Sequence, residues 1–212
     1  MAIEFDDSEK STSAVLADVI ASIGNTEHVT LRSILAQMGE NGLLLLCGLL
    51  SLPFLFPVSI PGVSTVFGAG IVLIGIAIMM NSLPWLPARI ADRKLESRKL
   101  VPVLQRGLVF VTRVNRYVQP RMLGLTSGAL MNRFNGLILT GAGLLLMAPL
   151  GFVPFSNTLP GVAILLLSAG ISQRDGAVVA GGYVMVVLTL VYFAVLGFLA
   201  VSAGQTLYQL GS

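Results

Sequence analysis

The sequence predicts an all-α, polytopic membrane protein with two internal repeats, each a proline-broken, re-entrant helical hairpin, plus amphipathic interfacial helices. Of the 212 residues, 55% are hydrophobic and 11% are charged, whereas an average soluble domain carries about 25% charged residues. Long apolar segments recur along the chain, and prolines interrupt one in each half. Such a composition cannot cover a soluble surface, so it indicates an integral membrane protein.

Hydropathy and charge divide the chain into five parts. Polar and amphipathic N-terminal helices are followed by a first membrane repeat, a basic cytoplasmic connection, a second membrane repeat, and a final transmembrane helix with the C-terminus. The predicted bounds of these parts are 1–40, 41–87, 88–134, 135–176 and 177–212.

The N-terminal part has the pattern of surface helices rather than membrane spans. Its start is acidic and polar, which is not typical of a cleavable signal peptide. Apolar residues recur at helical spacing from Ser11 onward, and Thr30 is the expected N-cap of a second helix. We expect these helices to lie at the membrane interface.

The first repeat contains two apolar segments with a break between them. Segment 43–58 holds Pro53 and Pro57, and segment 63–83 is apolar throughout. A helix needs about 20 residues to cross a bilayer, so the second segment is long enough. Trp85 follows it as an expected interface anchor.

The connection between the repeats holds most of the basic residues of the chain. The positive-inside rule therefore places it in the cytoplasm. A basic amphipathic helix is predicted to begin near Pro102 and to lie along the inner leaflet, with Arg106 and Arg113 among anionic headgroups. Arg121 is expected to bind lipid phosphate or to act as an anchor. A solvated basic loop that only fixes the orientation is the alternative.

The second repeat and the final helix supply three more apolar segments. Segment 136–153 is ended by prolines, and segment 162–172 is too short to cross as a straight helix. Segment 177–203 has no charge and is the clearest full span.

Short motifs align the two halves. The aligned pairs are Asn41-Gly42 with Asn135-Gly136, Pro61-Gly62-Val63 with Pro160-Gly161-Val162, and Ala69-Gly70-Ile71 with Ala169-Gly170-Ile171. Matched interruptions in two halves are typical of a transporter site. A duplication whose breaks only shape the packing would leave the same pattern. The residues predicted to form the breaks are Pro57, Pro61, Gly62, Pro154, Pro160 and Gly161.

The chemistry of the breaks favours an anionic ligand. Proline removes backbone donors, and backbone in hydrocarbon must satisfy its own hydrogen bonds, so the breaks should lie in protein or line a wet cavity. Helices that begin at Val63 and Val162 would direct their N-termini, the positive ends of their dipoles, toward the breaks. The predicted substrate-binding residues are Ser59, Ser64, Thr65, Ser156, Asn157, Thr158, Arg174 and Asp175. The alternatives are that the hydroxyl groups only cap helices and that Arg174 and Asp175 form a cytoplasmic turn.

Catalysis finds little support in the residues. The single histidine, His28, lies outside the apolar segments, and no carboxylate pair falls within one. No metal-ligand cluster or nucleotide loop is present, and Cys47 has the character of an apolar filler. We therefore expect no catalytic residue, no metal, no cofactor, no nucleic-acid partner and no enzymatic activity.

The chain resembles the bacterial ExoD family. The resemblance rests on LPFLFPVSIPGVSTVFGAGI (52–71), SLPWLPARI (82–90), QPRM (119–122) and PFSNTLPGVAILLLSAGISQRDG (154–176), in that order. The acidic N-terminal extension has no place in the family pattern. The resemblance implies a multi-pass protein of the bacterial cytoplasmic (inner) membrane, connected with exopolysaccharide production and with tolerance of alkaline conditions. It implies no particular reaction.

Together these features favour a small transporter, or a lipid-carrier flippase, for an anionic or phosphorylated substrate held between two broken hairpins. Membrane lipids are the expected partners, including an anionic lipid or a polyprenyl phosphate, and small residues in the apolar segments favour a homodimer. A non-transporting scaffold of the polysaccharide machinery is the second hypothesis. A cation/proton antiporter is the third, and the lack of an acid within a span argues against it.

Overall fold

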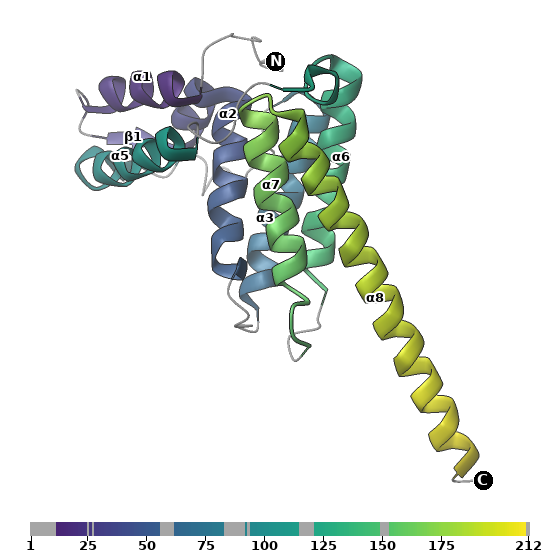
Figure 1. Ribbon diagram of the computed structural model, residues 1–212. Helices are drawn as coiled ribbons and strands as arrows, with labels where there is room; N and C mark the ends of the chain where they lie inside the picture. Colours follow the sequence, from purple (N-terminus) through teal and green to yellow (C-terminus); the bar gives the residue numbers. More distant parts are fainter. Residues whose placement is uncertain are drawn as a thin grey trace.

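The computed structural model describes residues 12–24, 26, 28–55, 62–82, 92, 94–114, 121–148 and 153–210 (Figure 1). The described elements are α1 Thr12–Gly24, β1 His28–Thr30, α2 Leu31–Ser51, η1 Leu52–Leu55, α3 Val63–Met79, β2 Lys94–Glu96, α5 Ser97–Val114, η2 Leu123–Leu125, α6 Ala129–Leu146, α7 Thr158–Ser172 and α8 Gly176–Leu210. The predicted all-α class is confirmed, with one short antiparallel strand pair, β1–β2, added to it.

The centre of the molecule is a bundle of α2, α3, α6 and α7. Each of these helices packs against two others, in the cyclic order α2, α3, α6, α7. Apolar side chains with almost no exposed surface fill the space between them, because all four helices are apolar along most of their length. The largest of these are Leu43, Leu44, Ile71, Ile78, Leu139, Leu146, Ile164 and Leu167. The bundle is therefore a solid core.

Glycines allow α3 and α6 to cross closely. A Cβ placed on Gly136 would lie 2.7 Å from the backbone nitrogen of Met79 and 2.8 Å from the carbonyl oxygen of Gly75. A Cβ on Gly75 would lie 2.9 Å from the backbone nitrogen of Thr140. Only glycine fits at such a distance, so the small-residue positions serve helix packing within one chain.

A second, smaller hydrophobic cluster joins the N-terminal elements to the connection. Leu16, Val19 and Ile23 of α1 pack with Ile34 of α2 and with the apolar face of α5. The β1–β2 pair ties the same elements together, with Val29 opposite Leu95. In Figure 1 this layer projects sideways from one end of the bundle, next to α2. The N-cap role predicted for Thr30 is confirmed: its side chain accepts from the Ser33 backbone nitrogen at 3.2 Å.

Two expectations for the basic helix need correction. The helix α5 begins at Ser97 rather than near Pro102, which lies inside it. Its apolar residues Leu104 and Leu108 pack with the α1 cluster, so a protein surface covers the face that was expected to contact lipid. The reason is that α1 is itself amphipathic, and two such helices bury more apolar surface together than either does at an interface.

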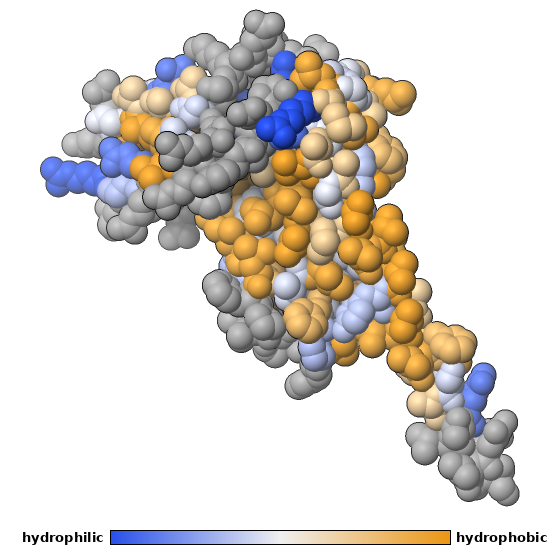
Figure 2. Space-filling model, in the orientation of Figure 1, coloured by the Kyte–Doolittle hydropathy of each residue, from blue (hydrophilic) through white to orange (hydrophobic). Residues whose placement is uncertain are grey.

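The last helix leaves the bundle. Near its start α8 packs against α7 through buried Val179, Val186 and Thr189. Further along it diverges and exposes large apolar side chains such as Val195 and Phe198 (Figure 1). By length and composition α6 and the stretch Gly176–Ala203 of α8 are each able to cross a membrane. Figure 2 shows apolar residues over the bundle and over most of α8. The strongly hydrophilic residues gather mainly at the end of the molecule that carries α1 and α5.

Helix bounds differ from the sequence prediction in the second half. The helix α6 starts at Ala129, seven residues ahead of the predicted apolar segment, and α7 starts at Thr158 rather than Val162. In the first half α3 starts at Val63 as expected, while α2 is kinked at Gly39, whose φ is 57°. Pro160 has no backbone N–H, but an N–H in the first turn of a helix has no partner within the helix in any case. The proline therefore costs no helical hydrogen bond, and α7 can begin before it.

Candidate functional site at the breaks

Both breaks lie at one end of the bundle. The end of η1, the start of α3 and the start of α7, which flank the two breaks, lie at the end of the bundle away from the α1–α5 layer (Figure 1). The start of α7 packs against η1: a Cβ on Gly161 would lie 2.9 Å from Cβ of Phe54. The chain that enters the first break therefore contacts the helix that leaves the second.

The helix start at the first break follows a glycine in the N-cap position. Gly62 takes a left-handed conformation, with φ 86°, and makes no side-chain cap for α3. Its carbonyl accepts from the Val66 nitrogen at 3.2 Å, so the amides of the first turn point out of the helix. Ser64 is half-buried there and Thr65 is exposed. Pro57, Ser59 and Pro61 lie outside the described residues.

The second break is more enclosed. Ser156 and Asn157 are buried, Thr158 is half-buried, and Pro154 is exposed. The Ser156 hydroxyl donates to the carbonyl of Val153 at 2.8 Å, so it holds the loop rather than facing outward. Asn157 occupies the N-cap position of α7, and its carbonyl accepts from the Gly161 nitrogen at 3.0 Å.

A tyrosine from α8 completes the second break. The Tyr192 hydroxyl donates to the carbonyl of Pro154 at 2.6 Å. Sequence reasoning missed Tyr192 because it treated segment 177–203 as a plain span. The signal was present: a tyrosine inside an uncharged helix needs a partner for its hydroxyl group.

Arg174 and Asp175 lie at the opposite end of α7 from the break, so the structure does not bring them to Ser156 and Asn157. Asp175 is 2% exposed, and its Oδ1 accepts from the backbone nitrogens of Ala177 at 3.0 Å and Val178 at 3.4 Å. It thus caps α8. Arg174 is an exposed turn residue with φ 54°. This geometry is that of the alternative considered for the pair, a turn at the charged end.

The predicted lipid contacts are only partly described. Arg121 is exposed and lies beside Asp175, because the Gly176 nitrogen donates to the Arg121 carbonyl at 2.6 Å. Trp85 and the side chains of Arg106 and Arg113 lie outside the described residues. No group of three or more His, Cys, Asp or Glu residues suited to a metal occurs among the residues that the structure describes.

A buried polar cluster at the charged end escaped sequence reasoning. Asn135 is 1% exposed, donates to the Leu125 carbonyl at 3.0 Å and accepts from the Tyr183 hydroxyl. Nearby on α6, Asn132 donates to the Glu40 carboxylate at 2.9 Å. In the Asn-Gly motif of the second half, the side-chain amide of Asn135 therefore holds the loop at Leu125, and Gly136 allows α6 to cross α3 closely.

The packing limits what the site can do. Leu43, Leu139 and Leu167 are fully buried in the bundle core, so no ligand fits along its axis in this conformation. The first turn of α3 has the geometry in which helix N-termini bind anions.

Comparison with known proteins identifies the family. The family model described as "Exopolysaccharide synthesis, ExoD" matches residues 12–195. The chain belongs to the ExoD family. Protein ExoD of Rhizobium meliloti is 62% identical over 208 residues, which cover 98% of this chain and 86% of that protein. An uncharacterized protein of Synechocystis is 28% identical over 161 residues, covering 76% of this chain and 74% of its own. No solved structure gives a significant match.

Membership links the chain to exopolysaccharide synthesis. The ExoD match begins at residue 12 and therefore includes α1 and the basic connection as well as both hairpins. The α1–α5 layer and the breaks accordingly lie within the region that the ExoD family model matches.

Proposed function

We propose that this ExoD protein is an integral inner-membrane transporter that carries a phosphorylated lipid, or another anionic intermediate of exopolysaccharide synthesis, and that it is not an enzyme. The substrate would bind at the two breaks, where the first turn of α3 presents its backbone amides and the second break supplies the polar side chains of Asn157 and Thr158. The observation that carries the proposal is the placement of both breaks at the uncharged end of the bundle, in contact through η1 and α7.

The depth of the second break supports a re-entrant arrangement. Tyr192, which holds Pro154, lies about 24 Å along the α8 axis from Gly176. Beyond Tyr192 the helix stays free of charge to Ala203, about 16 Å further. If α8 crosses the bilayer, the break lies beside the middle of that crossing rather than beyond its end. The hairpin α6–α7 would then enter from the charged side and return to it.

The packing pattern supports an internal repeat. A twofold operation that exchanges α2 with α6 and α3 with α7 turns the α2–α7 contact into the α3–α6 contact, and both contacts are extensive. The ends of α2 and α6 and the starts of α3 and α7 lie at the same end of the bundle (Figure 1). The repeats are therefore parallel in this proposal, and the axis relating them runs along the bundle.

The distribution of charge supports an orientation. From Asn41 to Ala88 and from Phe134 to Gln173 the sequence has no charged residue. Among the described residues Arg98, Arg121 and Arg174 all belong to the end that carries the α1–α5 layer. The positive-inside rule places that end in the cytoplasm, with the end of α8 on the other face.

Transport in liposomes tests the proposal. The purified protein should move a fluorescent polyprenyl phosphate, or a soluble anion, across vesicles, and Ser59→Ala and Asn157→Ala should each reduce the rate at least about tenfold. That factor corresponds to the loss of one charge-assisted hydrogen bond, about 1.4 kcal/mol. Gln205→Ala, on an exposed part of α8, is the control and should transport normally. Full activity of both break variants would overturn the proposal.

A scaffold of the polysaccharide machinery is the second candidate, because the core between the hairpins is fully packed. A scaffold needs no moving part, and it would work through its surfaces. In that case affinity purification of the protein would recover polymerase or export proteins, and the loss of exposed residues of α5 would matter more than the loss of Asn157.

A homodimer fits the exposed apolar stretch of α8. The residues there point away from the bundle, and either lipid or a second copy would cover them. The proposal includes a dimer through this stretch. Disulfide cross-linking of Val195→Cys in a Cys47→Ala background should give a dimer band, whereas cysteine at exposed Leu130 of α6 should not.

A further inference from the structure

We infer that the groove between the end of α3 and the start of α6 is a binding site for an anionic phospholipid of the cytoplasmic leaflet. The groove has a volume of about 560 Å³ and lies on the outside of the bundle, away from the breaks. Its lining residues are Met79, Met80, Leu130, Arg133, Phe134 and Leu137. The inference relies on the membrane placement proposed above, but it does not require transport.

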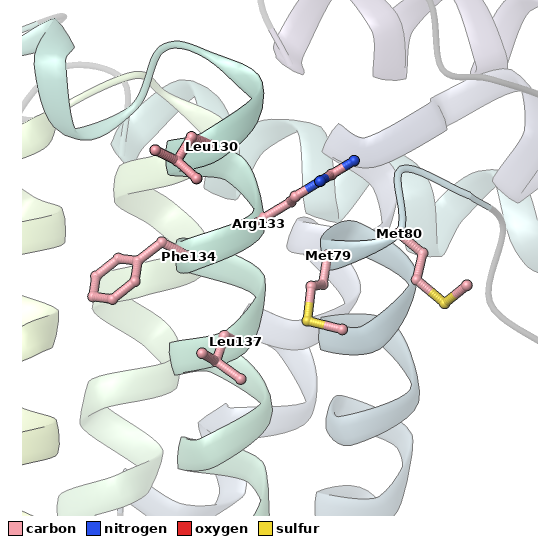
Figure 3. Close-up of a pocket in the computed structure, with 6 residues that line it drawn as sticks. All are labelled: Met79, Met80, Leu130, Arg133, Phe134 and Leu137. Atoms are coloured by element: carbon pink, nitrogen blue, oxygen red, sulfur yellow. The ribbon is translucent and has the colours of Figure 1, made fainter.

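The groove is lined by one cationic side chain, Arg133, and otherwise by apolar side chains. Figure 3 shows the Arg133 side chain extending from α6 toward the end of α3 that carries Met79 and Met80. Leu130, Phe134 and Leu137 follow one another down the same face of α6. A phospholipid has the matching order, with a phosphate at one end and apolar chains below it, so charge and apolarity are both complementary.

Arg133 is available for such a partner. It is exposed, and no ion pair to it is found within the part of the chain that the structure describes. The flanking helix ends, the start of α6 and the end of α3, carry dipoles of opposite sign, and Arg133 is the one charged residue among those that line the groove. A guanidinium binds phosphate oxygens through two parallel hydrogen bonds, which favours a phosphate headgroup.

The apolar wall continues beyond the groove. Leu144 on α6 and Leu73 and Val66 on α3 are exposed in the direction of the breaks. From Leu130 to Leu144 the axis of α6 rises about 21 Å, which exceeds the hydrocarbon depth of one leaflet, about 15 Å. The acyl chains thus have a surface to follow, while Phe134 is held in place by edge contact with Tyr183 at a centroid distance of 5.7 Å.

Quenching by brominated lipids tests the inference. In a Trp85→Phe background, a tryptophan replaces Leu137 in the groove or Leu188 on the exposed face of α8. The two proteins are inserted in bilayers containing brominated phosphatidylglycerol or brominated phosphatidylcholine. We expect about fivefold selectivity for phosphatidylglycerol at position 137, the factor for one basic residue near anionic lipid, and little selectivity at position 188.

Substitutions then test whether Arg133 causes the lipid selectivity. Arg133→Gln should remove the selectivity at position 137, while Arg98→Gln, an exposed arginine of α5 at the same end, should leave it unchanged. Equal selectivity at positions 137 and 188, or persistence of selectivity in Arg133→Gln, would overturn the inference. So would complete competition by inorganic phosphate at millimolar concentration, because a free anion would then be the ligand. Transport activity is not measured, so failure of this test leaves the transport proposal standing.

Discussion

At the scale of single residues, a few positions fix the distance between two helices or the conformation of a loop through one atom. Gly136 and Gly75 let two backbones approach, Tyr192 ties a helix to a break, and Asp175 starts α8. None of these roles is catalytic. Each is a contact whose loss has a defined structural cost.

Gly136→Ala should destabilise the bundle by about 1–3 kcal/mol, because the new Cβ would lie 2.7 Å from the Met79 nitrogen and must push α3 away. Thermal unfolding in detergent measures this as a lower Tm. Gly141→Ala is the matched control on the same helix, since a Cβ there meets nothing within 4 Å. Equal Tm values for the two variants would contradict the close crossing.

Tyr192→Phe should loosen the second break by about 1 kcal/mol, the usual value of one hydrogen bond, because only the hydroxyl that holds Pro154 is removed. Hydrogen exchange should speed up about fivefold in residues 153–159 and stay unchanged in residues 62–66. Phe193→Leu, next to it on α8, serves as the control. Unchanged exchange at the second break would show that the hydrogen bond does not restrain it.

Asp175→Ala should lower stability by about 1 kcal/mol, whereas Asp175→Asn should be close to neutral, because asparagine also caps a helix. Thermal unfolding measures both. In a pH-gradient assay with liposomes the two variants should match the wild type. Loss of proton-coupled activity in Asp175→Asn would instead favour the antiporter hypothesis.

At the scale of elements, helices and caps were predicted correctly where the sequence carries one clear pattern. The apolar segments, the start of α3 at Val63 and the cap at Thr30 could all be predicted. The start of α7 could not, because proline and glycine read as a break although both are tolerated in a first turn. The α1–α5 contact was also missed, since two amphipathic faces do not reveal whether they meet lipid or each other.

Leu104→Glu on α5 should detach the α1–α5 layer, because it places a carboxylate among Leu16, Val19 and Ile23. We expect faster proteolysis within residues 94–114 and also within α1. Gln105→Glu, exposed on the same helix, is the control and should be as resistant as the wild type. Faster cleavage of α5 with α1 unchanged would mean that the helix contacts lipid instead.

At the scale of the whole molecule, the candidate site divides into what the sequence contains and what only the fold reveals. The polar residues of the predicted break include Ser156 and Asn157, which are both buried at the second break. The prediction also assigned Arg174 and Asp175 to the site, although the helix α7 separates them from the break. The groove at Arg133 could not be predicted, because it depends on two helices that are far apart in the chain.

The proposed transport requires both breaks to lie within the bilayer, reached from the charged side. Cysteine accessibility in a Cys47→Ala protein tests this most directly, with single cysteines at Thr65, Phe155, Arg98 and Gln205. A membrane-impermeant maleimide should label Arg98→Cys from the cytoplasmic side and Gln205→Cys from the other side, and should label the two break positions from neither or far more slowly. Labelling of Thr65→Cys and Phe155→Cys as fast as Gln205→Cys would place the breaks outside the membrane and contradict the account.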